Sequence, residues 1–220
     1  MLNKAEKRLK SILYLLVLIY VITLVIGFYL NYQDHDTNAL GMVFVACLTP
    51  LIVPLLFRLL HLVPVYEIYI CNILFVYFAS LIGSGFHGYS QPYFDKVVHF
   101  FSGLIFTIVS MLIFMMIKKV SRIKDRNDYH LFLIFMNTAN LAIAVCWEFY
   151  EYAMLIFFNN DCINNYTQGV HDSITDMLCA FVGGLIITTL TAYAYQHNKN
   201  NFITNLCEKF YRLNIEKSSK

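Results

Sequence analysis

The chain has few charged residues. Asp, Glu, Lys and Arg make up 14% of its 220 residues, whereas 59% are hydrophobic; a typical soluble domain is about 25% charged. A water-soluble protein of this size could not bury so much apolar surface, so the composition excludes a soluble globular protein and predicts an integral membrane protein. The net charge of +2 is too small to indicate a nucleic-acid partner, and we expect none.

Paired cysteines and linkers are also lacking. The six cysteines are scattered, without the spacing of a metal site, a redox motif or a disulfide framework. No linker, internal repeat or low-complexity tract divides the chain, so we expect one membrane domain covering residues 1–220.

What the chain does have is six long apolar runs. They cover residues 11–30, 39–57, 65–82, 97–117, 131–158 and 173–195, and each approaches or exceeds the ~18–20 residues that a helix needs to cross a bilayer. We therefore predict an all-α integral membrane protein, a bundle of six transmembrane helices. Residues 200–214 follow, where apolar residues at helical spacing predict an amphipathic helix on the membrane surface.

Basic residues are nearly absent from one side of this bundle. With six crossings, every Lys and Arg except Lys96 falls in the two termini or in the second and fourth loops. By the positive-inside rule, both termini are cytoplasmic. The asymmetry also supports six crossings, because a missed or extra helix would distribute the basic residues over both sides.

Three pairs of ionisable residues lie on the side opposite the basic loops, near the ends of the last three apolar runs. These pairs are Asp95 with His99, Glu148 with Glu151, and Asp172 with Asp176. Spacings of three or four residues place each pair on one face of its helix. Below the acids, each face continues with small or polar residues, among them Gly103, Asn140 and Ala180. Since small residues let membrane helices approach closely, we expect these three helices to pack along the stripes and to bring their acidic ends together.

Five carboxylates at the edge of hydrocarbon are costly, and only Lys96 is a nearby cation. The cost can be offset by a bound divalent metal, by shared protons or by a cationic group on a ligand. Carboxylates with an imidazole suit Mg²⁺, Mn²⁺, Zn²⁺ or non-haem iron. The predicted metal ligands are Asp95, His99, Glu148, Glu151, Asp172 and Asp176, and the candidate catalytic acids or bases among them are Glu148, Glu151 and Asp176.

Simpler interpretations exist for some of these residues. Asp95 and Asp172 each precede an apolar run, where an acid can cap a helix and complement its dipole. His99 by itself could be a hydrogen-bonded packing residue, and Trp147 could pack or mark the membrane interface. Capping cannot explain Glu148 or its partner one turn further along, because both lie inside a helix.

Three motifs resemble a known family. The segments FDKVVHFFSG (residues 94–103), WEFYE (147–151) and DSITDM (172–177) occur in the order seen in the YjdF-like family of bacterial inner-membrane proteins, and the chain is more distantly similar to VanZ-like proteins. The resemblance implies a multi-pass protein of the bacterial cytoplasmic membrane. VanZ-like members are linked to glycopeptide-antibiotic resistance at the cell envelope, but the resemblance implies no established reaction.

Our leading hypothesis is an envelope protein whose outward-facing acidic site binds a divalent cation. The cation would act on, or hold, an anionic lipid-linked or cell-wall-precursor group, with Lys96 contacting a phosphate. The sequence leaves open whether the protein is an enzyme, and it leaves the oligomeric state open. The alternatives are a proton- or cation-coupled transporter, and a non-catalytic membrane assembly protein. Against a transporter, no inverted repeat is evident, and the acids gather at one membrane face instead of near the midplane.

Overall fold

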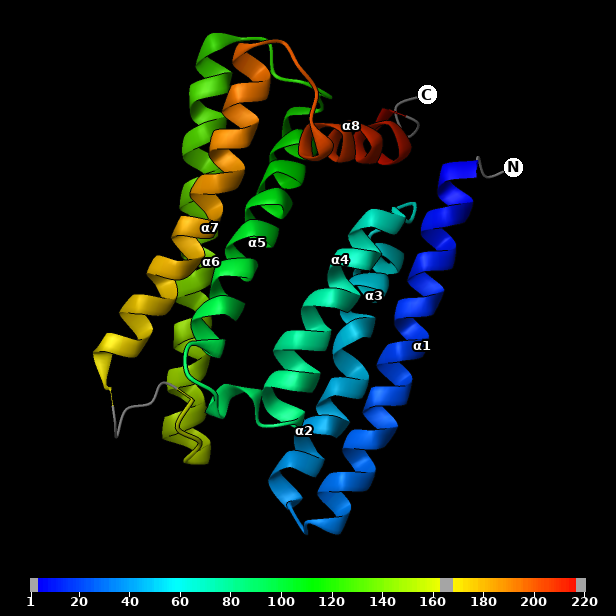
Figure 1. Cartoon of the computed structure of the whole chain (residues 1–220). Helices are drawn as coiled ribbons and strands as arrows, with labels where there is room; N and C mark the ends of the chain where they lie inside the picture. The colour runs from blue at the N-terminus through cyan, green and yellow to red at the C-terminus, as the bar shows by residue number, and fades with distance from the viewer. Residues whose placement is uncertain (1–3, 163–167, 217–220) are drawn as a thin grey trace. The chain divides into compact units, whose positions relative to one another are not determined.

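The protein consists of helices joined by short loops (Figure 1). The structure, a computed structural model, describes residues 4–162 and 168–216, and these contain no β-strand. The helices are α1 (Lys4–Gln33), α2 (Thr37–Leu48), η1 (Thr49–Leu51), α3 (Ile52–Leu59), α4 (Tyr66–Val76), η2 (Tyr77–Gly85), η3 (Gly88–Ser90), α5 (Phe94–Lys118), α6 (Arg126–Phe158), α7 (Val170–Gln196) and α8 (Phe202–Asn214).

Within the described residues, six helical segments are long and apolar enough to cross a membrane, which confirms the predicted all-α, six-span fold. Four of them are the single helices α1, α5, α6 and α7. These extend past the apolar runs at one or both ends, because polar residues continue a helix beyond the hydrocarbon region. The start of α6 is one example. The Asp125 carboxylate accepts hydrogen bonds from the N–H groups of Asp128 and Asn127, both at 2.9 Å, and these bonds hold the pKa of Asp125 below its usual range.

The other two spans are composite. In the second span, Thr37–Leu59, the short 3₁₀ turn η1 carries Pro50 and separates α2 from α3. Proline lacks an N–H group and its ring clashes with the preceding turn, so it interrupts an α-helix. The Pro50 carbonyl accepts a hydrogen bond from the Asn72 side chain at 3.0 Å. The third span, Tyr66–Gly85, continues from α4 into the π-helix η2.

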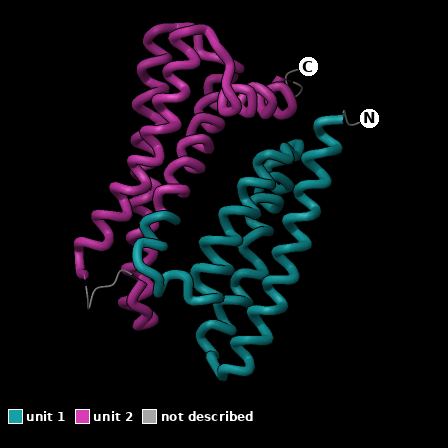
Figure 2. The backbone as a smooth tube through the Cα atoms, in the orientation of Figure 1, with its two compact units in different colours: residues 1–98 teal, residues 99–220 magenta. Residues whose placement is uncertain are grey.

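The chain separates into two compact units, residues 1–98 and 99–220, with the boundary inside α5 (Figure 2). The core of the first unit is apolar and includes Val43, Ile73 and Leu81. Two buried polar side chains join its helices: the Tyr20 hydroxyl donates to the Ala46 carbonyl at 2.7 Å, and the Asn31 amide donates to the Gly85 carbonyl at 2.8 Å. Where hydrocarbon replaces water, such bonds satisfy polar groups that have no other partner.

The second unit is built on α5, α6 and α7, with α5 and α7 running in one direction and α6 in the other (Figure 1). At its basic end, Arg122 lies between α5 and α6 and reaches the end of α7. Its guanidinium donates to the Asn200 side chain at 2.9 Å and to the Lys199 carbonyl at 3.1 Å, and it lies 5.2 Å from the centre of the Tyr195 ring. A cation at the carboxyl end of a helix complements the helix dipole there.

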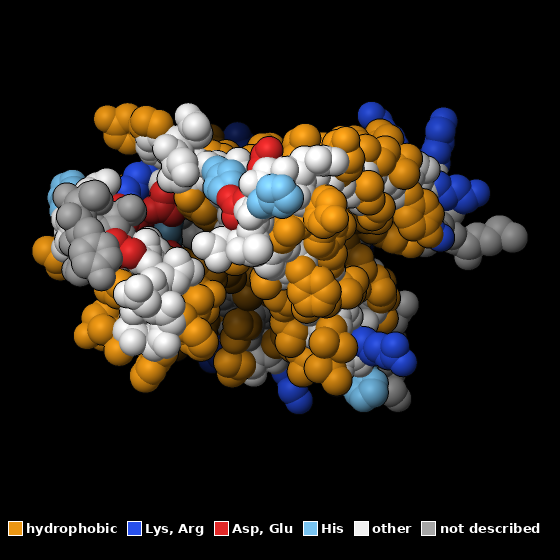
Figure 3. All heavy atoms as spheres, turned by 90° about the horizontal axis from the view of Figure 1, so that it is seen from below, with side chains coloured by type: hydrophobic (Ala, Val, Ile, Leu, Met, Phe, Trp, Pro, Cys, Tyr) orange, Lys and Arg blue, Asp and Glu red, His pale blue; other side chains and the backbone are white. Residues whose placement is uncertain are grey.

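Large hydrophobic side chains remain exposed along the spanning helices. Even the most enclosed span, α5, has only 39% of its hydrophobic window buried, and α1 has 11%. Figure 3 shows hydrophobic side chains over much of the visible face. Such exposure would promote aggregation in water, whereas lipid tails cover it in a bilayer.

Helix α8 (Phe202–Asn214) lies within the predicted amphipathic stretch at 200–214. It begins with a capping box, in which Asn201 and Thr204 each accept a hydrogen bond from the other's backbone N–H at 2.9 Å. Leu206 and Phe210 are buried in the protein, whereas Phe202 is exposed. Part of the apolar face of α8 therefore packs on protein, and the location of this helix at a membrane surface stays a prediction.

The buried thiol of Cys207 in α8 should resist alkylation. Burial, assisted by the nearby Glu208 charge, raises the pKa of this thiol to about 12, so at pH 8 only ~10⁻⁴ of it is thiolate. We expect maleimide to label Cys207 at least about a hundredfold more slowly than Cys162 in matched single-cysteine variants. Gel-shift kinetics in detergent would measure this ratio, and equal rates would mean that the Cys207 thiol is not buried.

Candidate metal site

The first two turns of α5 carry Asp95, Lys96 and His99. Asp95 and His99 are one turn apart and lie on the same face of the helix. The Lys96 ammonium is 3.4 Å from the Asp95 carboxylate, and these two side chains are 21% and 22% exposed. His99 is buried. The acid and the base next to it are therefore accessible, while the imidazole is enclosed by protein.

The start of α7 places its two acids inside the protein. The helix is capped by Gly169, which has a φ of 59° and makes no side-chain cap bond; glycine adopts this conformation without strain. Asp172 lies within the first turn and is 1% exposed, and Asp176, one turn further, is 0% exposed. Asp172 is therefore not the N-cap residue of α7, which is Gly169, but as an acid in the first turn it can complement the helix dipole as predicted.

Helices α5 and α7 are in backbone contact immediately below these acids. A side chain at Gly103 would collide with the carbonyl of Ala180, and one at Gly183 would collide with the carbonyl of Phe100. The predicted packing along small-residue stripes is confirmed at this crossing. Gly103 is one turn from His99, and Ala180 is one turn from Asp176, so the close crossing brings these two functional side chains together.

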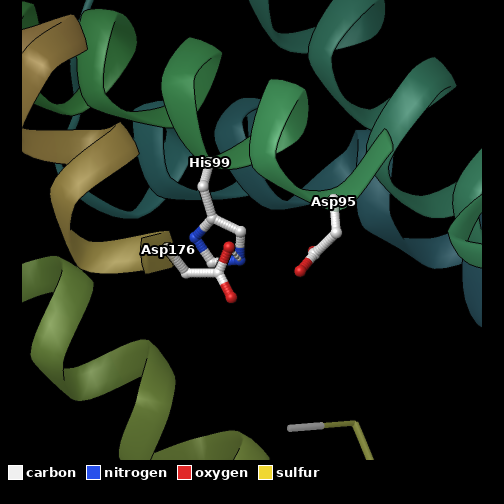
Figure 4. Close-up of side chains that lie close together, drawn as sticks. All are labelled: Asp95, His99 and Asp176. Atoms are coloured by element: carbon white, nitrogen blue, oxygen red, sulfur yellow. Dashed lines mark ion pairs between the residues drawn. The ribbon is translucent and has the colours of Figure 1, made fainter. Parts of the chain in front are cut away.

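One ligand atom each of Asp95, His99 and Asp176 lies within 4.8 Å of the other two. Figure 4 shows the His99 ring and the Asp176 carboxylate directed toward each other, with Asp95 on the same side of α5. His99 Nε2 and Asp176 Oδ1 are 3.9 Å apart, too far for a hydrogen bond. Two ligands of one ion, each at ~2.1 Å, can be up to about 4.2 Å apart. The spacing of His99 and Asp176 is within this limit, and the Asp–His–Asp group could hold an ion.

The remaining predicted ligands are buried but do not belong to the Asp–His–Asp group. Glu148 and Glu151, near the end of α6, are 7% and 8% exposed, and Asp172 is enclosed on α7. These three residues lie inside the second unit, and their role as metal ligands or catalytic groups stays a prediction.

Two polar residues lie deeper in the second unit. The Asn140 side chain on α6 donates to the Ala180 carbonyl on α7 at 3.0 Å. A side chain at Gly184 would meet both this amide and the Thr107 hydroxyl of α5. Asn140 and Thr107 are 1% and 0% exposed. They form a polar layer in which all three helices meet below the acids.

Trp147 has a contact that the sequence analysis did not anticipate. Its indole N–H donates to the Glu151 carboxylate at 2.7 Å. The sequence predicted only a packing or interface role for Trp147 and not this hydrogen bond. The i,i+4 spacing of the two residues on one helix is the signal that could have indicated it.

A helical protein with six membrane spans and an Asp–His–Asp group, of which His99 and Asp176 are buried, is a multi-pass membrane protein with a candidate metal site. The chain belongs to the family of predicted membrane proteins designated DUF2238, whose model matches residues 8–198. This match supports the multi-pass membrane location and fits a YjdF-like membrane family; the relationship to VanZ-like proteins stays a prediction. No curated protein and no solved structure matches the chain.

The crossing of α5 and α7 can be tested at Gly103. Gly103→Ala should destabilise the protein by roughly 1–3 kcal/mol, because the added methyl forces two helix backbones apart. Gly41→Ala is the matched control, since nothing lies within 4 Å of the added atom, and alanine favours a helix by about 0.5–1 kcal/mol. Thermal unfolding in detergent would show a lower Tm for the first variant only, and equal shifts would contradict the crossing.

Proposed function

We propose that the protein binds a divalent cation on the outer side of the membrane and uses it to hold or transform an anionic lipid-linked group. The observation that carries this proposal is the Asp–His–Asp group, with its ligand atoms within 4.8 Å of one another at the acidic end of α5 and α7. The outward orientation rests on the positive-inside rule, since the Lys and Arg residues cluster at the opposite end of these helices.

The chemistry of the three donors supports this choice of ion. Two carboxylates neutralise a divalent charge, and a neutral imidazole adds one nitrogen ligand. This combination favours Mn²⁺ or Zn²⁺ over Mg²⁺, which prefers oxygen ligands and retains its waters. Three protein ligands leave coordination positions for water or for an oxygen atom of a substrate.

The other predicted residues have distinct roles in this proposal. When bound, the cation would polarise a phosphoryl or carbonyl oxygen, or acidify a water molecule. Lys96 attracts the anionic headgroup, and its aliphatic stem can lie along apolar surface. Glu148 and Glu151 are the candidate proton acceptors, and Asp172 supports the site from the turn before Asp176. A substrate with a lipid tail fits a site at the membrane edge, because its headgroup can reach the acids while its tail stays in the bilayer.

Metal binding by the Asp–His–Asp group is the first test. Wild-type protein, incubated with Zn²⁺ or Mn²⁺ and desalted, should retain about one ion per chain by elemental analysis, as expected for one three-ligand site. Asp176→Asn and His99→Ala should each reduce retention at least about tenfold, because each removes one ligand. Asp128→Asn is the control, since Asp128 instead pairs with Lys118 at 2.8 Å.

Equal retention by all four proteins would contradict the assignment of ligands. If wild-type protein retains no ion and the protein instead carries a pH-dependent flux in vesicles, the acids share protons and the transporter alternative replaces this proposal.

The role of Lys96 is tested with a polyprenyl phosphate in nanodiscs. Lys96→Ala should weaken binding about tenfold, or ~1.4 kcal/mol, because it removes the cation next to Asp95. The effect should shrink at high salt, which screens an accessible charge. Lys124→Ala, an equal charge change in the basic loop between α5 and α6, should leave the affinity unchanged. Equal weakening by both variants would mean that only net charge matters.

A further inference from the structure

The geometry of α6 separates the two glutamates. Asn140, Ala144 and Glu148 are buried at intervals of four residues, so they define the face of α6 that packs inside the second unit. At about 100° per residue, Glu151 lies about 60° around the helix from Glu148 and only about 40° from Trp147. Glu151 therefore lies at the edge of the buried face, next to a residue that is 48% exposed.

Trp147 covers this edge. Its indole ring is half exposed, whereas the Glu151 side chain next to it is 8% exposed. The ring also packs against Tyr150, with the two ring centres 5.1 Å apart, so its orientation is supported on a second side. Its N–H donates to Glu151 Oε1 at 2.7 Å, at the short end of the range for N–H···O hydrogen bonds. An indole suits this place because it offers apolar area to lipid and one donor to the protein.

We propose that Trp147 is a positioning residue for Glu151, and that this hydrogen bond is coupled to occupancy of the metal site. The inference rests on the proposed function, in which Glu151 is a proton acceptor. A carboxylate at the edge of a helix bundle can also turn toward headgroups and water. The indole holds one carboxylate oxygen and keeps the side chain at the buried face, where a base can act on a group bound at the Asp–His–Asp group.

The single tryptophan of the chain makes the test specific. The ultraviolet resonance Raman spectrum of purified protein contains an indole N–H mode that shifts with hydrogen bonding, and Trp147 is its sole source. Glu151→Gln should shift this mode, because a neutral amide accepts a weaker bond than a carboxylate. Asp128→Asn, a charge change at the other end of α6, should not. If the glutamine variant does not fold, Glu151→Asp tests the same hydrogen bond, because its side chain is one methylene shorter.

Zn²⁺ tests the coupling to the metal site. Saturation with Zn²⁺ should shift the indole mode of the wild type and leave that of Glu151→Gln unchanged. Trp147→Phe should keep the Zn²⁺ stoichiometry, since the ligands on α5 and α7 are intact, and should change the Zn²⁺ affinity, because coupling between two sites is reciprocal.

Three results would overturn the inference. If neither Glu151 variant shifts the indole mode, the hydrogen bond between Trp147 and Glu151 does not exist. If the indole mode responds to these variants but not to bound Zn²⁺, the contact between Trp147 and Glu151 has only a structural role. If wild-type protein binds no Zn²⁺, the proposed function fails and the positioning role fails with it, while the response to Glu151→Gln still establishes whether the hydrogen bond exists.

Discussion

The close contact between α5 and α7 determines the geometry of the second unit. At Gly103 and Gly183, each helix meets a backbone carbonyl of the other with no space for a side chain. Lipid tails provide no hydrophobic driving force for helix association, so membrane helices associate through such contacts and through polar bonds between them. The short distance between His99 and Asp176, each one turn from this contact, depends on the crossing. If the helices were further apart, Asp176 could not lie 3.9 Å from His99.

The enclosure of the acids has an energetic cost. His99, Glu148, Glu151, Asp172 and Asp176 are all at most 8% exposed, and carboxylates in such surroundings require partners, protons or a cation. Trp147 is one such partner. A fold that needed only to span the membrane could have used apolar residues at these positions, as the first unit does. The number of buried acids in residues 99–220 is the reason to propose a function there.

The two units differ in how they use polar groups. In the first, the buried hydrogen bonds of Tyr20 and Asn31 go to backbone carbonyls, and its irregular turns occur at Pro50 and along η2. These bonds satisfy backbone groups inside the unit and leave its core apolar. In the second, the buried polar groups include ionisable side chains that do chemistry elsewhere in proteins. Most of the buried ionisable side chains therefore lie in residues 99–220.

The sequence by itself determined the six spans and the polar faces of the last three helices, because apolar run length and helical periodicity are local properties of the chain. The interruption of the second span at Pro50 is likewise local, because it follows from the covalent structure of proline. Only the tertiary structure showed that Asp95, His99 and Asp176 lie within one ion's reach while Glu148, Glu151 and Asp172 are outside that group, since spacing along one helix does not define the distance to another. The tertiary structure also decided the cap at Gly169 and the hydrogen bond from Trp147 to Glu151. The residue that begins a helix, and the direction of a side chain at the edge of a buried face, both depend on the neighbouring residues in the packed protein.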